Sequence, residues 1–418
     1  MKNSRLLTIF LIVFIDLLGF SLILPLLPYY AESYGATATL VGLLVAAYAA
    51  AQLIGAPLLG RLSDRVGRKP VLLLSVAGTC VGFLMLGFSD PIGRGLAGVI
   101  APQAANEFII AILFLSRILD GLTGGNITVA QAYITDVTDE QNRAKGLGMI
   151  GAAFGLGFII GPAVGGALSK WGYNLPAFVA ALVSFINIFM IIFLLEESLP
   201  VERRSAASGQ TRPPFTFHAL KEALNRPKVG PLLQVRLIYA LAFATFQTIF
   251  ALYAQSIGLS SQTTGILLAY VGVISVVVQA GLIGRLTRRF GDNVLMITGL
   301  WIMAGALLAW AFATQLWFLV VLILPLAAAG GVLNTVIQSS ITKSVTRLEV
   351  GGILGITASL EAVTRIIAPI AGAYLLQNLG LWAPGIFSTF LMALTIVLAY
   401  WRIILPANRE RVAEGTLR

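Results

Sequence analysis

Five ionisable side chains lie inside long apolar stretches of the sequence: Asp16, Arg117, Asp120, Glu361 and Arg365. An ionised group in a lipid bilayer costs about 2.5–3.5 kcal/mol on insertion scales, so such residues mark function by default. A carboxylate there can bind and release a proton, because desolvation favours its neutral form. We therefore predict that these five residues couple proton movement to another process.

Asp16, Arg117 and Asp120 allow more than one pairing. Asp16 is either a proton carrier, which we favour, or a permanent partner of Arg117. Arg117 and Asp120 are three residues apart and share a helix face, so a local salt bridge is the alternative to a switching role. The corresponding positions of the second half, Leu324 and Ala327, are uncharged. This difference favours a chemical role for the charges over a role in helix packing.

Glu361 and Arg365 are four residues apart, in the order that favours an ion pair on one helix. If they neutralise each other, the pair is structural. If they face a cavity, Glu361 becomes a proton-binding or cation-binding group of the second half. The spacing leaves both interpretations open.

Uncharged polar and aromatic residues also occur within the apolar stretches. Amides and aromatic rings together are suited to an amphiphilic organic ligand, although each amide is at least as well explained by hydrogen bonds between helices. As substrate-binding residues we predict Gln52, Asn126, Gln131, Gln247, Phe250, Asn334 and Gln338.

The elements that carry these residues are membrane spans. The chain of 418 residues is 58% hydrophobic, its mean hydropathy is +0.90, and its apolar runs reach the roughly 20 residues needed to cross a bilayer. The N-terminal run lacks a signal-peptide cleavage site and is taken as the first span. The twelve predicted spans are 6–30, 38–59, 71–89, 106–135, 146–169, 175–195, 231–254, 264–284, 293–313, 316–341, 351–376 and 383–405.

The spans form two similar halves. GRLSDRVGRK, which begins at Gly60, has a weaker copy, GRLTRRFGDN, which begins at Gly284. We predict an all-α polytopic membrane protein with twelve transmembrane helices in two pseudo-symmetric six-helix bundles, 1–195 and 231–418. The polar linker 196–230 joins them and contains a short amphipathic segment, FHALKEAL, that suits a surface helix.

Basic residues fix the orientation of the spans. With both termini in the cytoplasm, all but five of the 28 Lys and Arg residues lie on the inner side or in the linker and tail. The exceptions are Arg94 and Lys170 outside and Arg117, Arg236 and Arg365 in or at the edge of spans. The net charge of +10 is thus a topology signal, and no nucleic-acid partner is expected.

Several classes of site are not expected. The chain has one cysteine, Cys80, and one histidine, His218, so the sequence offers no disulfide or histidine-rich metal site. It has no nucleotide-binding GxxxxGK[ST] sequence and no Ser/His/Asp constellation. We therefore expect no cofactor, no bound metal and no enzymatic activity, and a monomer in the bilayer.

Four motifs resemble the major facilitator superfamily, and within it the twelve-span drug/proton antiporters of the tetracycline-resistance type. GRLSDRVGRK is similar to the loop between spans two and three, and LSRILDGLTGG (115–125) to the span-four motif. GFIIGPAVGG (157–166) is similar to the antiporter signature of span five, and DLLGFSLILPLLP (16–28) to the first span. The resemblance implies alternating access driven by a proton gradient, in a bacterial inner membrane.

The same resemblance implies gating residues. Asp64 would brace the N-terminus of span eleven when the cavity faces outward, and Arg65 would reach Asp136 at the inner end of span four. The alternative for the charged turn is topology alone. The small residues of span five would allow close helix approach, and Pro162 a kink. The implied gating set is Gly60, Asp64, Arg65, Gly67, Arg68, Asp136, Gly157, Gly161, Pro162, Gly165 and Gly166.

These observations predict a secondary active transporter, with a small-molecule substrate and protons as its partners. The favoured function is proton-coupled export of a small amphiphilic or drug-like compound. The alternative is proton-coupled import, or facilitated movement, of a sugar, an organic acid or a lipid. A receptor or an enzyme on the same scaffold is a rival from another class.

Overall fold

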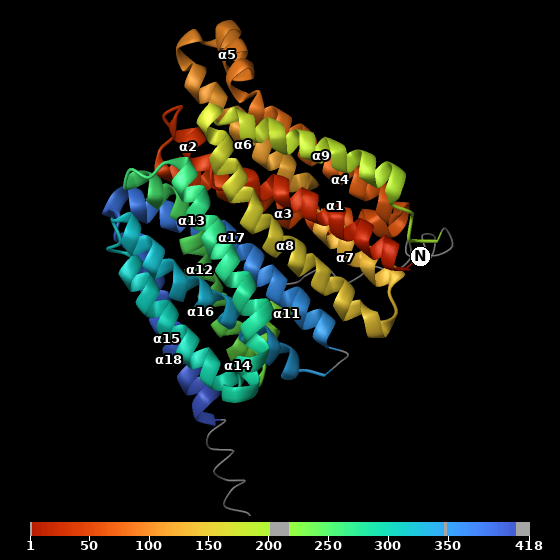
Figure 1. Ribbon diagram of the computed structural model, residues 1–418, viewed down its shortest axis with the longest axis vertical. Coiled ribbons are helices and arrows are strands. Elements are labelled where there is room, and N and C mark those ends of the chain that lie inside the picture. The colour runs from red at the N-terminus through yellow and green to blue at the C-terminus, as the bar shows by residue number, and fades with distance from the viewer. Residues whose placement is uncertain (1, 201–216, 347–348, 407–418) are drawn as a thin grey trace, which may run out of the picture. The chain divides into compact units, whose positions relative to one another are not determined.

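The computed structural model describes residues 2–200, 217–346 and 349–406, and it is helical almost throughout (Figure 1). Within these ranges no strand occurs. Among the described residues, twelve segments are long and apolar enough to cross a membrane. The prediction of an all-α polytopic protein with twelve spans is therefore confirmed.

The chain divides into two compact units. The first comprises Met1–Arg212 together with Ala254–Gly272, and the second comprises Pro213–Tyr253 and Val273–Arg418. The sequence-based division into 1–195, 196–230 and 231–418 stays a prediction, and residues 201–216 of that linker lie outside the described ranges.

The first unit is built on the packing of α1 against α8 and α9, of α3 against α6, and of α4 against α9. Figure 1 shows α1, α4 and α9 running side by side, with the short α5 at one end of the unit. Its helices are α1 (Lys2–Ile23), α2 (Leu27–Glu32), α3 (Ala38–Val66), α4 (Arg68–Gly87), α5 (Ser89–Ile100), α6 (Ala105–Thr123), α7 (Asn126–Val137), α8 (Glu140–Leu168) and α9 (Asn174–Leu194).

The charged stretch between spans two and three is helical rather than a loop. Helix α3 continues to Val66 and α4 begins at Arg68, so Gly67 alone joins the two helices. The φ angle of Gly67 is +119°, a conformation that residues with a Cβ rarely adopt. In the second unit, Gly291 with φ +76° joins two helices in the same way. In both units a single glycine with positive φ is thus the whole connection between two helices.

The fourth span consists of two helices. Helix α6 ends at Thr123 and α7 begins at Asn126, with Gly124 and Gly125 between them. The side-chain amide of Gln52 on α3 donates a hydrogen bond of 3.0 Å to the carbonyl oxygen of Gly124. This bond satisfies a backbone acceptor that the interrupted helix leaves without its usual partner. Gln52 thus supports the helix break that places Asn126.

The end of α8 contacts the start of α13 within the first unit. The hydroxyls of Ser169 and Ser261 lie 2.8 Å apart. The phenol of Tyr29 lies 2.7 Å from the hydroxyl of Thr264 and donates a 3.0 Å hydrogen bond to the carbonyl oxygen of Leu259. These hydroxyl contacts explain why Ala254–Gly272 belongs to the first unit.

The remaining helices belong to the second unit, except that the end of α12 and most of α13 lie in the first. The amphipathic segment of the linker forms a helix, as predicted. Two short π-helical turns interrupt or end the spans, and π-turns of this kind occur mostly as local bulges within α-helices. The helices are α11 (Phe217–Asn225), α12 (Gly230–Ser256), α13 (Ser261–Val276), η3 (Val277–Leu282), α14 (Ile283–Phe290), α15 (Asp292–Trp310), α16 (Leu316–Lys343), α17 (Val350–Leu379), α18 (Ala383–Ala399) and η4 (Tyr400–Ile404).

An aromatic cluster fills the core around α12. Phe246 packs edge-on against Trp310 with ring centroids 5.1 Å apart, and Phe250 packs on Phe246 at 5.3 Å. The Phe250 side chain is fully buried. Phe250 is thus part of the packed core in this conformation, and its predicted contact with substrate stays a prediction.

Candidate functional site

A buried polar cluster lies in the first unit, where α1, α4, α6 and α7 meet. Each member is at most 7% exposed, although all are polar or charged. Buried polar groups persist only where hydrogen bonds or opposite charges stabilise them, so the contacts within the cluster decide its chemistry. The members are Asp16 on α1, Thr79 on α4, Arg117 and Asp120 on α6, and Asn126 on α7.

Asp16 is partnered by an amide. The side-chain NH2 of Asn126 donates a short hydrogen bond to Oδ2 of Asp16. The orientation of that amide is fixed, because its oxygen accepts a 2.7 Å hydrogen bond from the backbone N–H of Ile127. Asn126 is also the first residue of α7, a position that attracts negative charge through the helix dipole. The residue that sequence reasoning assigned to substrate contact thus binds the carboxyl group of Asp16.

The second oxygen of Asp16 is buried and has no hydrogen-bond partner among the described residues. An ionised carboxylate is stabilised by accepting several hydrogen bonds. A protonated carboxyl group is neutral and needs fewer hydrogen bonds. The observed partner of Asp16 is a neutral amide. Protonation of Asp16 would therefore not remove the counter-ion of any cation. This arrangement permits Asp16 to change its protonation state.

Arg117 and Asp120 form the local salt bridge that the sequence left as an alternative. Nη1 of Arg117 lies 3.2 Å from Oδ2 of Asp120, and both side chains are 3% exposed. The guanidinium carbon lies 5.4 Å from the ring centroid of Phe83, within cation–π range. Nε and Nη2 of Arg117 are buried without a hydrogen-bond partner among the described residues. Arg117 thus keeps two donors that a further acceptor can engage.

The charges of the cluster do not balance. Two carboxylates, Asp16 and Asp120, share the space with one guanidinium, Arg117. A buried, unpaired carboxylate is costly, and a single bound proton removes the surplus charge. The cluster therefore holds one carboxylate more than its guanidinium can neutralise.

The small residues of α8 bring α1 close. A Cβ atom on Gly161 would lie 2.0 Å from Oγ of Ser21, and one on Gly165 would lie 2.2 Å from the carbonyl oxygen of Leu22. The hydroxyl of Ser21 donates a 2.8 Å hydrogen bond to the carbonyl oxygen of Gly157. Gly157, Gly161 and Gly165, spaced four residues apart on α8, therefore all lie directly against α1.

Pro162 and Gly166 occupy another face of α8, which contacts α13. A Cβ on Gly166 would approach the carbonyl oxygen of Ser261 to 3.0 Å. Likewise, a Cβ on Gly265 would lie 2.2 Å from the carbonyl oxygen of Pro162. The motif GPAVGG thus allows two close helix contacts, one with α1 and one with α13. Whether these contacts move during a transport cycle stays a prediction.

A second charged group joins α3, α4 and the end of α7. Arg68, at the start of α4, contacts Asp64 at 2.6 Å and Asp136 at 2.9 Å. Arg68 is 6% exposed. Arg65, which we predicted to reach Asp136, is exposed, and the prediction is wrong because Arg68 takes that position after the turn at Gly67.

Further groups complete the surroundings of Arg68. The carboxylate of Glu197 accepts hydrogen bonds from the backbone N–H groups of Arg68 and Lys69, at 2.9 and 3.2 Å. The half-buried Gly60 lies one turn before this group on α3. The bracing of span eleven by Asp64 stays a prediction.

The second unit holds a separate ion pair on α12, α16 and α17. Nε of Arg236 donates a 3.0 Å hydrogen bond to Oε1 of Glu361, and Nη2 donates a 2.7 Å hydrogen bond to the side-chain oxygen of Asn334. Arg236 is 7% exposed. Of the two interpretations left open for Glu361, the local pair with Arg365 does not form here, because the more buried Arg236 takes the carboxylate.

Sequence reasoning did not select Arg236 as a site residue. The signal was present, since an arginine lies within the first third of the seventh span. Asn334, predicted to bind substrate, instead orients this arginine. Of the other predicted amides, Gln131 and Gln247 are exposed and Gln338 is half-buried.

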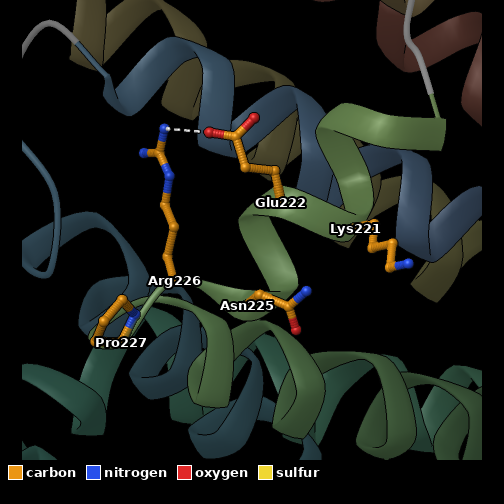
Figure 2. Close-up of a pocket in the computed structure, with 5 residues that line it drawn as sticks. All are labelled: Lys221, Glu222, Asn225, Arg226 and Pro227. Carbon is orange, nitrogen blue, oxygen red and sulfur yellow. Dashed lines mark ion pairs between the residues drawn. The ribbon is translucent and has the colours of Figure 1, made fainter.

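A pocket of about 440 Å³ opens beside the linker helix α11. Figure 2 shows Glu222 of this helix and Arg226, just after its end, pointing toward one another. Their Oε1 and Nη2 atoms lie 3.9 Å apart. Arg226 also contacts Glu349, just before α17, at 3.0 Å. Hydrogen bonds from Thr346 and the nearby Arg226 lower the pKa of Glu349. The pocket is lined by Lys221, Glu222, Asn225, Arg226 and Pro227.

This pocket does not have the composition of a site for an amphiphilic compound. Its five lining residues are exposed, four of them are polar or charged, and none is an intramembrane residue described above. Pockets for small organic ligands are mostly apolar with a few placed polar groups. The contacts of Arg226 instead indicate that α11 is fixed to the start of α17.

Comparisons with known proteins place the chain among membrane transporters. It matches the Major Facilitator Superfamily over residues 9–294 and 232–417. It is 30% identical over 373 residues to the class C tetracycline resistance protein of Escherichia coli, covering 88% of this chain and 89% of that protein. It is 28% identical to multidrug resistance protein 2 of Bacillus subtilis, covering 92% of each chain.

Solved structures show the same fold. The human organic anion transporter MFSD10 matches with a TM-score of 0.66 and 23% identity, over 95% of this chain and 99% of that one. A D-xylose-proton symporter matches with a TM-score of 0.72 and 16% identity, over 94% and 97% of the two chains. The predictions of this fold, and of a transporter rather than an enzyme, are confirmed.

Proposed function

We propose, because the chain belongs to the major facilitator superfamily of membrane transporters, that it is a proton-coupled antiporter that exports a small amphiphilic compound. Membership of the family already makes it an integral membrane transporter of small molecules. The proposal adds the coupling ion, the direction and the kind of substrate. In this proposal the protein works as a monomer in a bacterial inner membrane, with both termini in the cytoplasm.

The observation that carries the proposal is the environment of Asp16. This carboxyl group is buried in a membrane span, is held by the neutral amide of Asn126, and belongs to a cluster with one carboxylate more than its cations. A group that must be neutral when buried and can be ionised when wet binds a proton from one side and releases it to the other.

Arg117 provides a means of coupling. Its unengaged Nε and Nη2 can donate hydrogen bonds to Asp16, as a second carboxylate partner, after a movement of α1 toward α6. That approach would favour the ionised form of Asp16 and expel its proton. Asp120 keeps Arg117 charged and in place throughout, at 3.2 Å. Proton release then depends on conformation, as antiport requires.

The gate proposed for this cycle uses Asp64. Arg68 holds Asp64 at the cytoplasmic end of α3, with Asp136 as its second carboxylate. We propose that Asp64 braces the N-terminus of span eleven when the site opens outward. In this proposal Gly60, Arg65 and Gly67 belong to the same gate. Glycines of α8 are the proposed pivot of the same motion.

The substrate class follows from the relatives. Tetracycline resistance proteins and a multidrug resistance protein align with most of the chain. Both names refer to amphiphilic organic drugs, and such compounds need an apolar pocket with a few polar groups. We therefore propose a drug-like amphiphile as the exported compound.

Proteoliposomes that contain a pH-sensitive dye test the proposal. Tetracycline and ethidium are added first as probes, followed by a panel of amphiphilic drugs. Export by antiport predicts that movement of a compound in one direction drives protons in the opposite direction. Proton movement in the same direction as the compound would identify an importer, the alternative function. Movement of panel compounds with no proton flux would contradict proton coupling.

A further inference from the structure

Helix α17 exposes two opposite faces of different chemistry. With 3.6 residues per turn, Val363, Ile367 and Tyr374 lie on one side of the helix. They are 38%, 46% and 56% exposed, which suits contact with lipid. The opposite side carries a charged face, defined here as Ala358, Glu361, Ala362 and Arg365, all exposed or half-exposed.

Arg365 lies at the middle of the membrane span. It is the sixteenth residue of the thirty in α17, roughly 22 Å from the start of the helix at 1.5 Å per residue. A guanidinium at this depth cannot face hydrocarbon without a large cost, and it is too far from either end to reach the interface easily. The charged face must therefore be in contact with water or a polar ligand.

The expected counter-ion of Arg365 is engaged elsewhere. Arg236 contacts Glu361 with both Nε and Nη2, and both of these hydrogen bonds go to the same oxygen, Oε1. In the described ranges, Arg365 forms no ion pair within 4.0 Å. Its side chain is exposed. Arg365 is thus a mid-membrane cation whose donors are available.

The charges on α12 and α17 have the opposite surplus to those of the Asp16 cluster. Two guanidiniums, Arg236 and Arg365, accompany one carboxylate, Glu361. The cluster in the first unit has two carboxylates and one guanidinium. A surplus negative charge is neutralised by a proton, whereas a surplus positive charge is neutralised by an anion.

We propose that Arg365 binds an anionic group of the transported compound. Arg is suited to this role because its planar guanidinium donates two parallel hydrogen bonds to a carboxylate, sulfonate or phosphate. Oε2 of Glu361, one helical turn away, accepts a hydrogen bond from an N–H or O–H of the same compound. The substrate class is a singly charged amphiphilic organic anion. This inference rests on the proposed function only for the statement that the bound compound is exported.

Cysteine labelling tests the site without knowledge of the native substrate. In a chain with Cys80 replaced by alanine, Ala362→Cys places one thiol three residues from Arg365. The reaction rates of an anionic sulfonate and a cationic trimethylammonium methanethiosulfonate are compared, with and without Arg365→Gln. Two unit charges about 6 Å apart in water change each rate about threefold, in opposite directions. The ratio of anionic to cationic rate should therefore fall about tenfold in Arg365→Gln.

Val363→Cys is the matched control, because it lies on the opposite, apolar face of the same helix. It should react slowly with both reagents, and its rate ratio should not depend on Arg365. An unchanged ratio at position 362, or equal reactivity at 362 and 363, would overturn the proposal. Arg365→Lys keeps the positive charge but removes the planar guanidinium. It should therefore leave the ratio of anionic to cationic labelling rates unchanged. Size-exclusion profiles check that each variant is folded.

The ligand class is tested by protection of the Ala362→Cys thiol with two matched probes, 1-naphthoate and 1-naphthamide. We expect naphthoate to slow labelling at least tenfold more effectively than the neutral amide, and Arg365→Gln to remove this preference. Equal protection by both probes, or by neither, would overturn the assignment of an anion. Labelling needs no proton gradient, so it can succeed or fail independently of proton coupling.

Discussion

The close contact between α1 and α8 gives the most direct structural prediction. Two glycines of α8 differ in the atoms that an added Cβ methyl group would contact. A Cβ on Gly165 would lie 2.2 Å from the carbonyl oxygen of Leu22, a backbone atom that cannot rotate away. A Cβ on Gly151, earlier on the same helix, would meet nothing within 4 Å. Gly165→Ala and Gly151→Ala are thus a matched pair.

The expected magnitude follows from the two environments. Gly165→Ala must push α1 away by about 1 Å to reach an ordinary contact, and such overpacking costs about 1–3 kcal/mol. Gly151→Ala instead removes a flexible residue from a helix interior and should stabilise the protein by about 0.5–1 kcal/mol. The two variants should therefore differ by about 1.5–4 kcal/mol, with Gly165→Ala the less stable.

Thermal unfolding in detergent, followed by size-exclusion chromatography, measures the difference. Gly165→Ala should lose monodisperse protein at a temperature several degrees below that of the parent, and Gly151→Ala at the same or a higher temperature. Transport of panel compounds should fall in Gly165→Ala, since displacement of α1 also displaces Asp16. Equal stability and equal transport in the two variants would refute the close-packing role of the glycine motif.

Other contacts give shorter predictions. Arg68→Gln leaves two carboxylates without their cation and should destabilise the protein by about 1–3 kcal/mol in thermal unfolding; an unchanged midpoint would contradict the bridging role. Gln52→Leu should cost about 1 kcal/mol by the same assay, through the lost hydrogen bond to Gly124, and a gain in stability would speak against it. Arg236→Gln should cost about 1–3 kcal/mol, and adding Glu361→Gln should restore most of the loss; strict additivity would exclude a direct pair.

Much of the fold follows from the sequence because bilayer thickness dictates it. Runs of about 20 apolar residues have few alternatives to membrane helices, and basic loops indicate their orientation. The spacing of glycines in GFIIGPAVGG also predicts close packing, since a contact that needs no side chain leaves a visible pattern. The break at Gly124 and Gly125 is less visible, because it depends on a hydrogen bond from Gln52 on another helix.

Ion pairing is where sequence spacing misleads. The i, i+4 rule pairs Glu361 with Arg365, but that rule describes isolated helices in water, where each such pair is worth a few tenths of a kcal/mol. Arg236 is buried, so leaving it without a carboxylate costs far more, and it takes Glu361 from another helix. Asp136 likewise pairs with Arg68 and not with Arg65, because the turn at Gly67 directs the Arg68 side chain inward.

For Asp16, the position could be predicted from the sequence but the hydrogen-bond partner could not. Its place in the first span and its need for a partner follow from the sequence, since a lone acid there is costly. Its partner does not, because Asn126 reaches it only after the chain has broken α6 and restarted as α7. Partners that depend on a helix break cannot be read from periodicity.

Proton coupling through Asp16 is the central claim, and Asp16→Asn tests it most directly. The amide preserves size and hydrogen bonding but cannot bind or release a proton. Asp90→Asn, an acid in an exposed ion pair with Arg94, is the control. In proteoliposomes with a pH-sensitive dye, the control should keep the proton flux that accompanies transport. Asp16→Asn should lose that flux while its binding of the same compound, measured without a gradient, is kept; full gradient-driven transport in Asp16→Asn would contradict the account.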